Sequence, residues 1–286
     1  VTINVNKTGG YNLSYINDGE PNITQTEDRK LHAVYGLNAS SNPQNSSEQG
    51  GAIEVITKNG SISVTAKNES KNLTNSHVYA AANDNGHLIL SAGQGTGYEG
   101  TGSISLSAES IRNNNVYGLD TWGGEENRLT ADKIFISAKA ESGNAYGVKV
   151  SGGANDNKFN ADYNEVKGVS ESGNAYGIWA DGDSSVDVTG KDNFISGIVT
   201  GNPKNGTGIM VDGSDVSIEG NNNYINADVD TDGNEVYLGN AKGFAIDAKN
   251  VSWVVVKGNV SNTFGGAVYA NGTGTNILVE GKGNNN

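Results

Sequence analysis

Residues 141–147 read ESGNAYG, and the same seven letters return at residues 171–177. The first copy continues as Val148-Lys149-Val150 and the second as Ile178-Trp179-Ala180, so apolar residues follow the final glycine at the same two places. Similarity at a spacing of a few tens of residues is the signature of stacked structural repeats. The two copies therefore set the register in which the rest of the chain is compared.

The last glycine of this phrase, or an alanine in its place, marks each repeat along the chain. The marks are Gly36, Ala80, Gly118, Gly147, Gly177, Gly208, Gly243 and Gly266. Their spacing varies between 23 and 44 residues, which is natural for stacked units whose loops differ in length. Two longer loops, 39–51 and 94–102, are candidate recognition segments, because a solenoid can extend loops without disturbing its core.

Two further strand patterns recur between the marks. One is an alternating apolar pattern that ends in glycine, at residues 186–190, 216–220, 254–258 and 277–281. The other is an alternating pattern that ends in alanine, at residues 61–66, 103–108 and 133–138. Alternation of β-branched residues, bounded by Gly, Asn and Asp, indicates strands and not helices. Each repeat is therefore predicted to contain three short strands.

Three short strands without room for a crossover helix predict parallel coils, in which each strand pairs with its copy in the next repeat. We expect an all-β parallel β-helix (β-solenoid) of about nine coils, with neighbouring coils about 4.8 Å apart. The composition is 35% hydrophobic with 41 glycines. Such a modest apolar content suits a narrow core that only alternate residues face.

The register predicts which columns of residues face the core. One position after the marks lie Leu37, Ala81, Leu119, Val148, Ile178, Ile209, Phe244 and Ala267. One position before the marks stand Tyr35, Tyr79, Tyr117, Tyr146 and Tyr176, which Thr207, Lys242 and Gly265 replace in the later repeats. Strand parity places these tyrosines on the same side as the core column, as a buried stack. Asparagines at the corners are expected to form side-chain ladders between coils.

An outward column lies two positions after the marks and becomes apolar in the second half of the chain. Its apolar members are Trp179, Met210, Ala245 and Val268. A contiguous exposed apolar strip on a soluble chain marks a contact surface, so these residues are the predicted binding site. The competing interpretation is that a loop, such as 150–160 or 200–206, folds over Trp179 and Met210.

Charge and composition exclude several classes of function. The formal net charge is −13 and the 19 basic residues are scattered, which argues against nucleic-acid binding, since phosphates require clustered Lys and Arg. The chain has no cysteine, so it forms no disulfide and holds no thiolate zinc site. No apolar run approaches the ~18 residues of a membrane helix, and direct membrane insertion of this segment is not expected.

One segment resembles part of a calcium-binding loop. Asp228, Asp230 and Asp232, followed by Gly233, provide alternating side-chain oxygens and a sharp turn. The twelfth position, where such loops carry a bidentate Glu, is Gly239. An ordinary acidic loop is the alternative interpretation, and Ca²⁺ is the only cofactor that the sequence suggests.

Catalytic motifs are weak. The pairs Asp181 and Asp183, and Asp212 and Asp215, stand in Gly- and Ser-containing corners where Asp commonly forms turns. The nearest string to a serine-protease loop, residues 212–215, has the wrong order, and His32, His77 and His87 lie far from it in the sequence. The sequence therefore predicts no catalytic residue.

Taken together, the repeated AYG phrases, the alternating SI-containing strands, the corners rich in Asn and Gly, the absence of Cys and the acidic charge resemble the passenger domains of bacterial autotransporters and related filamentous secreted adhesins. The resemblance covers essentially the whole chain. It implies a right-handed β-helix that is displayed from the bacterial outer membrane at the cell surface. Residues 1–286 would then be a single β-solenoid segment excised from a longer passenger, without its C-terminal translocation barrel.

The function implied by this resemblance is adhesion without catalysis. Expected partners are a host or bacterial surface protein or glycan, or other copies of the rod, as in aggregation and biofilm formation. The alternative from a different class is a carbohydrate-active β-helix enzyme, a polysaccharide lyase or hydrolase, because such enzymes also use this scaffold.

Overall fold

The computed structural model describes residues 2–7, 33–39, 52–57, 60–68, 77–95, 98–99, 102–111, 115–124, 126–201, 204–229, 243–250, 252–257 and 266–280. These residues form three parallel sheets, which we name A, B and C, and one short hairpin. Their order along the chain is A, B, C, repeated coil after coil. The predicted parallel β-solenoid of three short strands per coil is confirmed.

Each sheet is built from strands that pair in chain order. Sheet A consists of β1 (Thr2–Lys7), β4 (Ile62–Asn68), β9 (Ser103–Ser110), β12 (Lys133–Ala140), β15 (Tyr163–Ser170), β18 (Asp192–Val199) and β21 (Asn222–Val229). Sheet B consists of β2 (Ala33–Asn38), β5 (His77–Asp84), β10 (Val116–Trp122), β13 (Ala145–Ser151), β16 (Ala175–Asp181), β19 (Gly206–Asp212), β22 (Gly243–Lys249) and β24 (Gly266–Asn271). Sheet C consists of β3 (Ala52–Thr57), β6 (His87–Ala92), β11 (Glu126–Thr130), β14 (Asn157–Asn160), β17 (Ser185–Thr189), β20 (Asp215–Glu219), β23 (Trp253–Lys257) and β25 (Asn276–Glu280).

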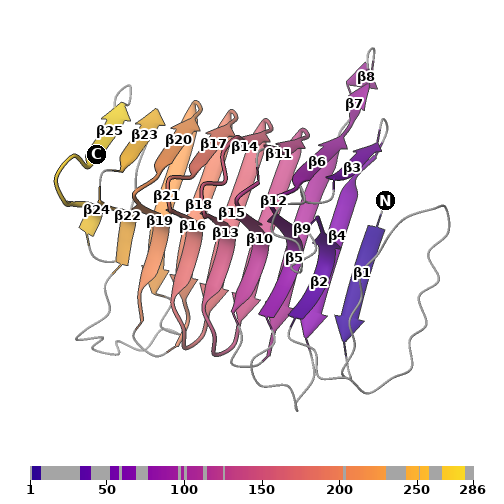
Figure 1. The fold of residues 1–286 in the computed structure, drawn as a ribbon, viewed down its shortest axis with the longest axis horizontal. Helices are drawn as coiled ribbons and strands as arrows, with labels where there is room; N and C mark the ends of the chain where they lie inside the picture. Colours follow the sequence, from indigo (N-terminus) through magenta and orange to yellow (C-terminus); the bar gives the residue numbers. More distant parts are fainter. Residues whose placement is uncertain are drawn as a thin grey trace.

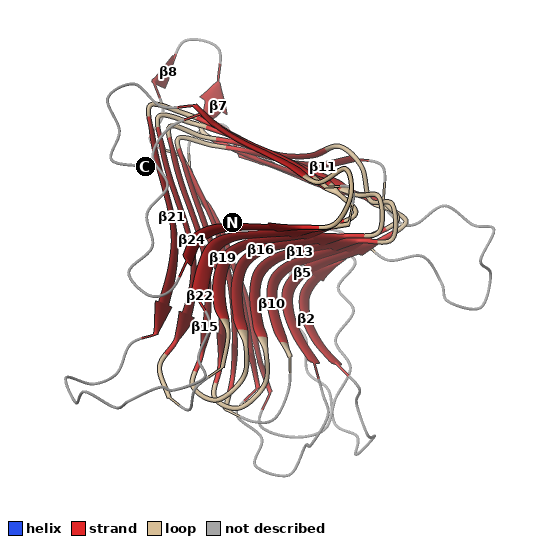
Figure 2. Cartoon of the chain, turned by 90° about the vertical axis from the view of Figure 1, so that its left-hand side faces the viewer, coloured by secondary structure: helices blue, strands red, loops and turns tan. Residues whose placement is uncertain are grey.

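The coils stack into an elongated body with the first strands at one end and the last at the other (Figure 1). Viewed along the stack, the three sheets surround a common interior, and the strands of sheet B bend sharply along their length (Figure 2). A two-stranded hairpin, β7 (Gln94–Gly95) with β8 (Tyr98–Glu99), projects from the stack in the predicted second loop. Most of the other predicted recognition loop, residues 40–51, lies outside the described residues.

The interior is a continuous apolar core to which all three sheets contribute. Val148 from sheet B, Phe159 from sheet C and Val166 from sheet A are each at most 1% exposed. Along most strands buried and partly exposed residues alternate, as in β9 and β15. This alternation is the period-2 pattern that the sequence shows.

The repeated ESGNAYG phrase forms the corner between sheets A and B. Asn174 donates its backbone N–H to Asn144 Oδ1 of the preceding coil at 2.9 Å, so identical asparagines bridge successive coils. A Cβ on Gly173 would lie 2.1 Å from the Gly143 carbonyl oxygen, so only glycine allows the two copies to stack. The phrase occurs twice because adjacent coils must match at the same corner.

The corner between sheets C and A is held by a second asparagine ladder, as predicted for corner asparagines. Asn164 Nδ2 donates to Asn193 Oδ1 at 2.8 Å, and Asn193 Nδ2 donates to Asn223 Oδ1 at 2.6 Å. All three asparagines are fully buried. Each amide group therefore donates to the next one away from water, while Asn164 Oδ1, at the start of this run, accepts no hydrogen bond among the described residues.

The predicted register is confirmed for six marks and wrong for the last two. Tyr176 pairs with Thr207, but Thr207 pairs with Phe244, and Phe244 pairs with Gly266. The true equivalents of the marks are therefore Ala245 and Ala267, and not Gly243 and Gly266. Ile246 and Val268 take the core positions that were predicted for Phe244 and Ala267. The glycine that marks the earlier repeats is not at the bend in these coils.

No helix occurs in the described part of the chain. Accordingly, none of the described residues belongs to a helix that is long and apolar enough to cross a membrane.

Candidate ligand-binding faces

The tyrosine ladder of sheet B (Tyr35, Tyr79, Tyr117, Tyr146 and Tyr176) is stacked as predicted. Neighbouring rings lie 4.7–5.1 Å apart between centroids, with interplanar angles of 6–15°. Tyr117, Tyr146 and Tyr176 are at most 8% exposed. The predicted stacking is therefore confirmed for all five tyrosines, and the predicted burial for these three, whereas Tyr35 and Tyr79 are partly exposed.

The ladder nevertheless faces away from the core, which corrects the parity prediction. A Cβ on Gly147 would lie 2.9 Å from Val166 Cγ1 in the core, and the next residue, Val148, also belongs to the core. Two consecutive positions thus face inward where sheet B bends, and strand alternation is reset at that glycine. Tyr146 before the bend therefore shares the outer face with Lys149 and with Trp179 of the next coil. The rings of Tyr146 and Trp179 meet edge to face, with their centroids 5.8 Å apart.

Two residues of the predicted binding strip lie side by side on this outer face. Trp179 pairs with Met210 in the ladder, and both pack with the tyrosines in one apolar cluster. Met210 is only 6% exposed, so the prediction of an open strip is wrong at this residue. It is the tyrosine ladder of the concave bend that packs against Met210 and Trp179.

The other two residues of the strip do not continue it. Asp247 and then Tyr269 follow Met210 in the column. Ala245 is fully buried in the core. Val268 occupies a core position and is 44% exposed in the last described strand of sheet B.

Asp120 lies in the same outer column between Ala82 and Lys149. Its Oδ1 atom is buried without a hydrogen-bond partner among the described residues. Desolvation raises the pKa of Asp120 to about 6, while nearby Lys149 opposes the shift. This carboxyl group is thus poorly accommodated in its charged form.

Replacement of Asp120 by Asn should therefore stabilise the protein near neutral pH. The folded-state pKa lies above the ordinary value of about 3.9, so the contribution of Asp120 to stability is fully present below about pH 4 and lost as the pH rises through about 6. We expect the free energy of unfolding of the variant to exceed that of the parent by up to about 2 kcal/mol at about pH 8 and by much less at about pH 4. Denaturant titrations at both pH values measure this difference, and an equal difference at both would contradict the assignment.

A second aromatic group stands on the outer face of sheet A. The aromatic ladder of sheet A (Phe135, Tyr163, Phe194 and Tyr224) crosses four successive strands. Its rings lie 5.6, 5.2 and 4.8 Å apart between centroids, and the interplanar angles fall from 44° to 33° to 10°. Tyr224 is 40% exposed, and the other three are partly exposed. These rings point outward, away from the filled core.

The aromatic ladder of sheet A borders a hollow of about 370 Å³. The lining side chains are Tyr163, Glu165, Lys167, Phe194, Ile195, Ser196, Ile198, Tyr224 and Asn226. Tyr163 donates its hydroxyl hydrogen to Glu165 Oε2 at 3.1 Å, which fixes the carboxylate at the rim. The hollow combines aromatic and aliphatic surface with a carboxylate, an ammonium group, an amide and a hydroxyl, and so offers the chemistry of a small-ligand site.

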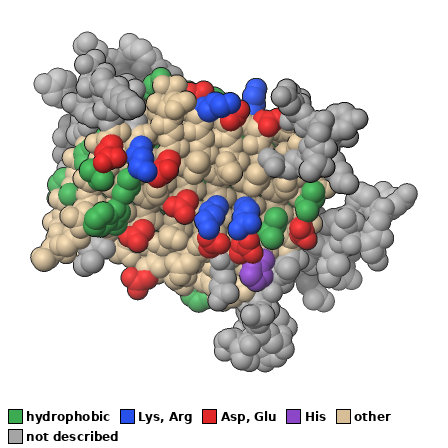
Figure 3. Space-filling view, turned by 90° about the horizontal axis from the view of Figure 1, so that it is seen from above, with side chains coloured by type: hydrophobic (Ala, Val, Ile, Leu, Met, Phe, Trp, Pro, Cys, Tyr) green, Lys and Arg blue, Asp and Glu red, His purple; other side chains and the backbone are tan. Residues whose placement is uncertain are grey.

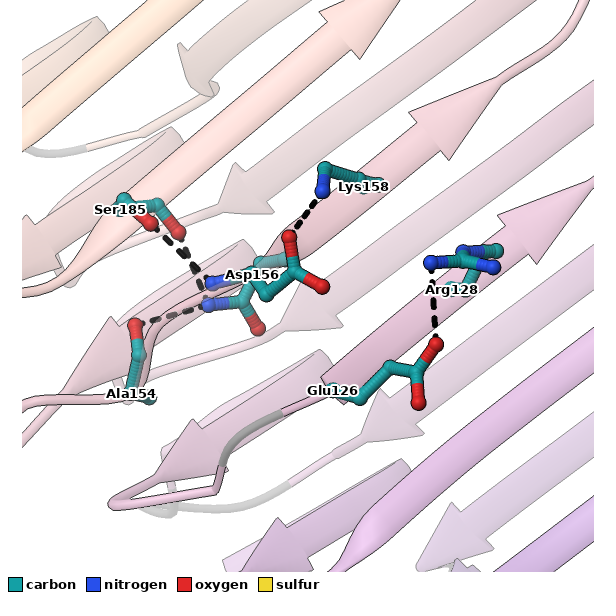
Figure 4. A network of polar contacts seen from close by, with 7 residues as sticks. Glu126, Arg128, Ala154, Asp156, Lys158 and Ser185 are labelled. Carbon is teal, nitrogen blue, oxygen red and sulfur yellow. Dashed lines mark hydrogen bonds and ion pairs between the residues drawn. The ribbon is translucent and has the colours of Figure 1, made fainter.

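The outer face of sheet C mixes charges of both signs and carries a small apolar patch near its C-terminal end (Figure 3). The patch consists of Trp253, Val255 and Leu278. In the middle of the face, Arg128 pairs with Glu126 at 3.0 Å and Lys158 pairs with Asp156 (Figure 4). Since both cations are neutralised within their own coil, this face has a balanced, solvated surface.

The proposed calcium loop lies mainly outside the described residues. Asp228 is in β21 and pairs with Ile198 in the ladder, whereas Asp230 and Asp232 are not described. Within the described ranges, no group of three or more His, Asp or Glu side chains could hold a metal ion.

The aromatic ladder of sheet A was not predicted, although the sequence carries a signal for it. Residues 193–195 read NFI and residues 223–225 read NYI, so a buried Asn, an outward ring and a core Ile recur one coil apart. Alternation alone assigns these rings to the surface. Their contact with Tyr163 is diagonal across coils and requires the register of sheet A.

Comparisons with known proteins give no relative from which a function can be transferred. No protein-family model matches the chain, and neither the curated proteins nor the solved structures contain a detectable match. The faces described above are therefore the basis for a functional proposal.

Proposed function

We propose that this chain is a non-catalytic adhesin segment, displayed from the bacterial outer membrane, that attaches the cell to a host ligand or to other bacterial cells. The observation that supports this most is the aromatic ladder of sheet A. Partly exposed rings gather there on the outside of a solenoid whose core is filled by its own side chains. Grouped exposed aromatic side chains are typical of contact surfaces.

The shape of the fold supports the same proposal. Stacked coils present equivalent outward positions side by side, so a sheet face offers an extended surface to a large ligand. Phe194 and Tyr224 stack directly at 4.8 Å in adjacent strands, and Tyr163 joins them from the preceding strand. These side chains lie outside the core, so their presence is explained better by contact with a partner than by stability.

Truncation of the two most closely stacked rings should reduce attachment without unfolding the chain. Beads coated with the Phe194→Ser, Tyr224→Ser variant should bind epithelial or bacterial cells at least about tenfold less well than parent beads, because aromatic anchors dominate interface energies. The melting temperature should change little, since outward side chains contribute little to the core. Bead counting by flow cytometry and a thermal melt measure the two quantities.

The matched control removes an exposed aromatic side chain elsewhere. Trp253 lies on the outer face of sheet C and is 51% exposed. The Trp253→Ser variant should leave attachment unchanged. Parent beads that bind no better than beads carrying an unrelated acidic protein would remove adhesion as the function.

A carbohydrate-active enzyme is the second candidate, and the charged face of sheet C is the observation that favours it. Glu126 and Arg128 lie one coil before Asp156 and Lys158 (Figure 4), and Asp187 follows in the next coil. Polysaccharide lyases and hydrolases use carboxylates, or carboxylates with cations, in their active sites. Burial raises the pKa of Asp187, and Lys158 opposes this shift. New reducing ends or unsaturated products from a polysaccharide panel would establish catalysis and contradict our proposal.

A further inference from the structure

The outer face of sheet A differs in charge from the outer face of sheet B. Its described side chains include Lys67, Lys133, Lys139 and Lys167 against Glu109, Glu165 and Asp192. The outer face of sheet B carries Asp84, Asp120, Asp181, Asp212 and Asp247 against Lys149 and Lys249. On a chain with a net charge of −13, the outer face of sheet A thus repels an anion less than that of sheet B.

Lys167 places a positive charge in the wall of the hollow. In the strand pairing of sheet A it lies between Ser137 of β12 and Ser196 of β18. Among the described residues it forms no ion pair, whereas Lys139 on the neighbouring strand pairs with Glu109 at 3.2 Å. An ammonium group without a carboxylate partner, at the edge of an aromatic hollow, is suited to receive an anionic group from a ligand.

The remaining lining groups suit a sugar ring. Tyr163, Phe194 and Tyr224 offer tilted rings against which the C–H face of a sugar can pack. Glu165, Ser196 and Asn226 line the same hollow with groups that hydrogen-bond hydroxyls. A volume of about 370 Å³ is at the small end of ligand pockets, of a size for about one or two sugar units.

We propose that the hollow on sheet A binds an acidic saccharide, a glycan unit whose carboxylate or sulfate group pairs with Lys167 while its ring packs on Phe194 and Tyr224. This inference rests on the proposed adhesive function and names the class of ligand for the same face. Glu165 is held at the rim by Tyr163, where it accepts hydrogen bonds from sugar hydroxyls. The anionic group selects the ligand, and the aromatic rings supply the contact area.

The test compares acidic and neutral glycans that differ as little as possible. Purified chain is applied to an array carrying hyaluronan oligosaccharide, sialyllactose and sulfated N-acetyllactosamine, beside chitin oligosaccharide, lactose and unmodified N-acetyllactosamine. We expect binding to at least one acidic glycan and none to its neutral counterpart, with a decrease as salt is raised. The carboxylated and sulfated probes distinguish the two possible anionic groups.

Substitutions connect that binding to the hollow. Lys167→Met should weaken binding of the acidic glycan at least about tenfold, because it removes a charge-assisted contact. Lys257→Met removes the same charge from the outer face of sheet C, where Lys257 pairs with Glu219, and should leave binding unchanged. A circular dichroism melt confirms that both variants are folded.

Three outcomes overturn the inference. They are equal binding of acidic and neutral glycans, binding that Lys167→Met and Lys257→Met weaken alike, and no glycan binding at all. If parent beads still attach to cells through Phe194 and Tyr224 while no acidic glycan binds, the ligand class is wrong and the adhesive function stands. If parent beads do not attach to cells at all, the proposed adhesive function is wrong, and the inference that rests on it falls with it.

Discussion

Tyr146→Asp should lower the free energy of unfolding by about 3–5 kcal/mol, because it places a charge in a buried aromatic stack. Tyr146 is 8% exposed and lies between Tyr117 at 5.0 Å and Tyr176 at 5.1 Å. The nearby carboxyl of Asp120 would add repulsion. Denaturant unfolding followed by circular dichroism measures the loss.

Tyr146→Phe is the matched control for this prediction. It keeps the stacked ring and removes only the hydroxyl, which accepts a hydrogen bond from Asn144 Nδ2 at 3.3 Å. We expect a loss of about 1 kcal/mol or less. An aspartate variant that unfolds like the parent would show that the tyrosine ladder does not exist as described.

Asn193→Asp should destabilise the protein by about 3 kcal/mol or more at neutral pH, since it buries a carboxylate in the asparagine ladder between sheets C and A. Asn193 is fully buried and donates its amide hydrogens to Asn223 Oδ1 at 2.6 Å and to the Glu219 carbonyl oxygen at 3.2 Å. A carboxylate can donate neither hydrogen bond. Chemical denaturation at neutral pH measures the change.

The pH dependence of this variant provides an independent check. Burial should raise the folded-state pKa of the new carboxyl above its ordinary value of about 3.9, so the destabilisation should be small below about pH 4 and grow as the pH rises. Asn160→Asp makes the same substitution at an exposed position of β14 and should change stability little. Equal losses from Asn160→Asp and Asn193→Asp would contradict the buried ladder.

The sequence was sufficient to predict the fold because successive coils require the same residue types at equivalent positions. The phrase at 141–147 and 171–177 combines an asparagine that bridges coils, a tyrosine that stacks and a glycine at the bend. The marks then located the strands of sheet B, and alternation identified four strands of sheet C (β17, β20, β23 and β25) and three of sheet A (β4, β9 and β12). Each of these features acts between neighbouring residues or equivalent positions, which a linear pattern can show.

The direction of the tyrosine ladder could not be predicted from parity. Parity holds only while a strand remains regular, and the bend at Gly147 turns two successive residues inward. The register of the last two coils failed for a related reason. Ala245 and Ala267 occupy the bend position there. An alignment based on glycine therefore chose the nearby Gly243 and Gly266 instead.

The candidate site required three-dimensional information of another kind. Outward direction was predicted correctly for Met210, yet the concave bend and its neighbours leave it only 6% exposed. The hollow on sheet A combines Tyr163, Phe194 and Tyr224 from three coils. The contacts of Phe194 with Tyr163 and with Tyr224 depend on how the coils are aligned. Burial and diagonal contacts are properties of the stack, which no single repeat contains.

Hydroxyl-radical footprinting of the chain bound to its target cells is the most direct test of attachment through sheet A. Ligand contact reduces side-chain oxidation wherever the partner covers the surface, and the described faces carry separate aromatic reporters. We predict protection of Tyr163, Phe194 and Tyr224 on sheet A, with Trp253 on sheet C oxidised as in the free chain. Protection of Trp253 with unchanged oxidation of Tyr163, Phe194 and Tyr224 would contradict attachment through this face.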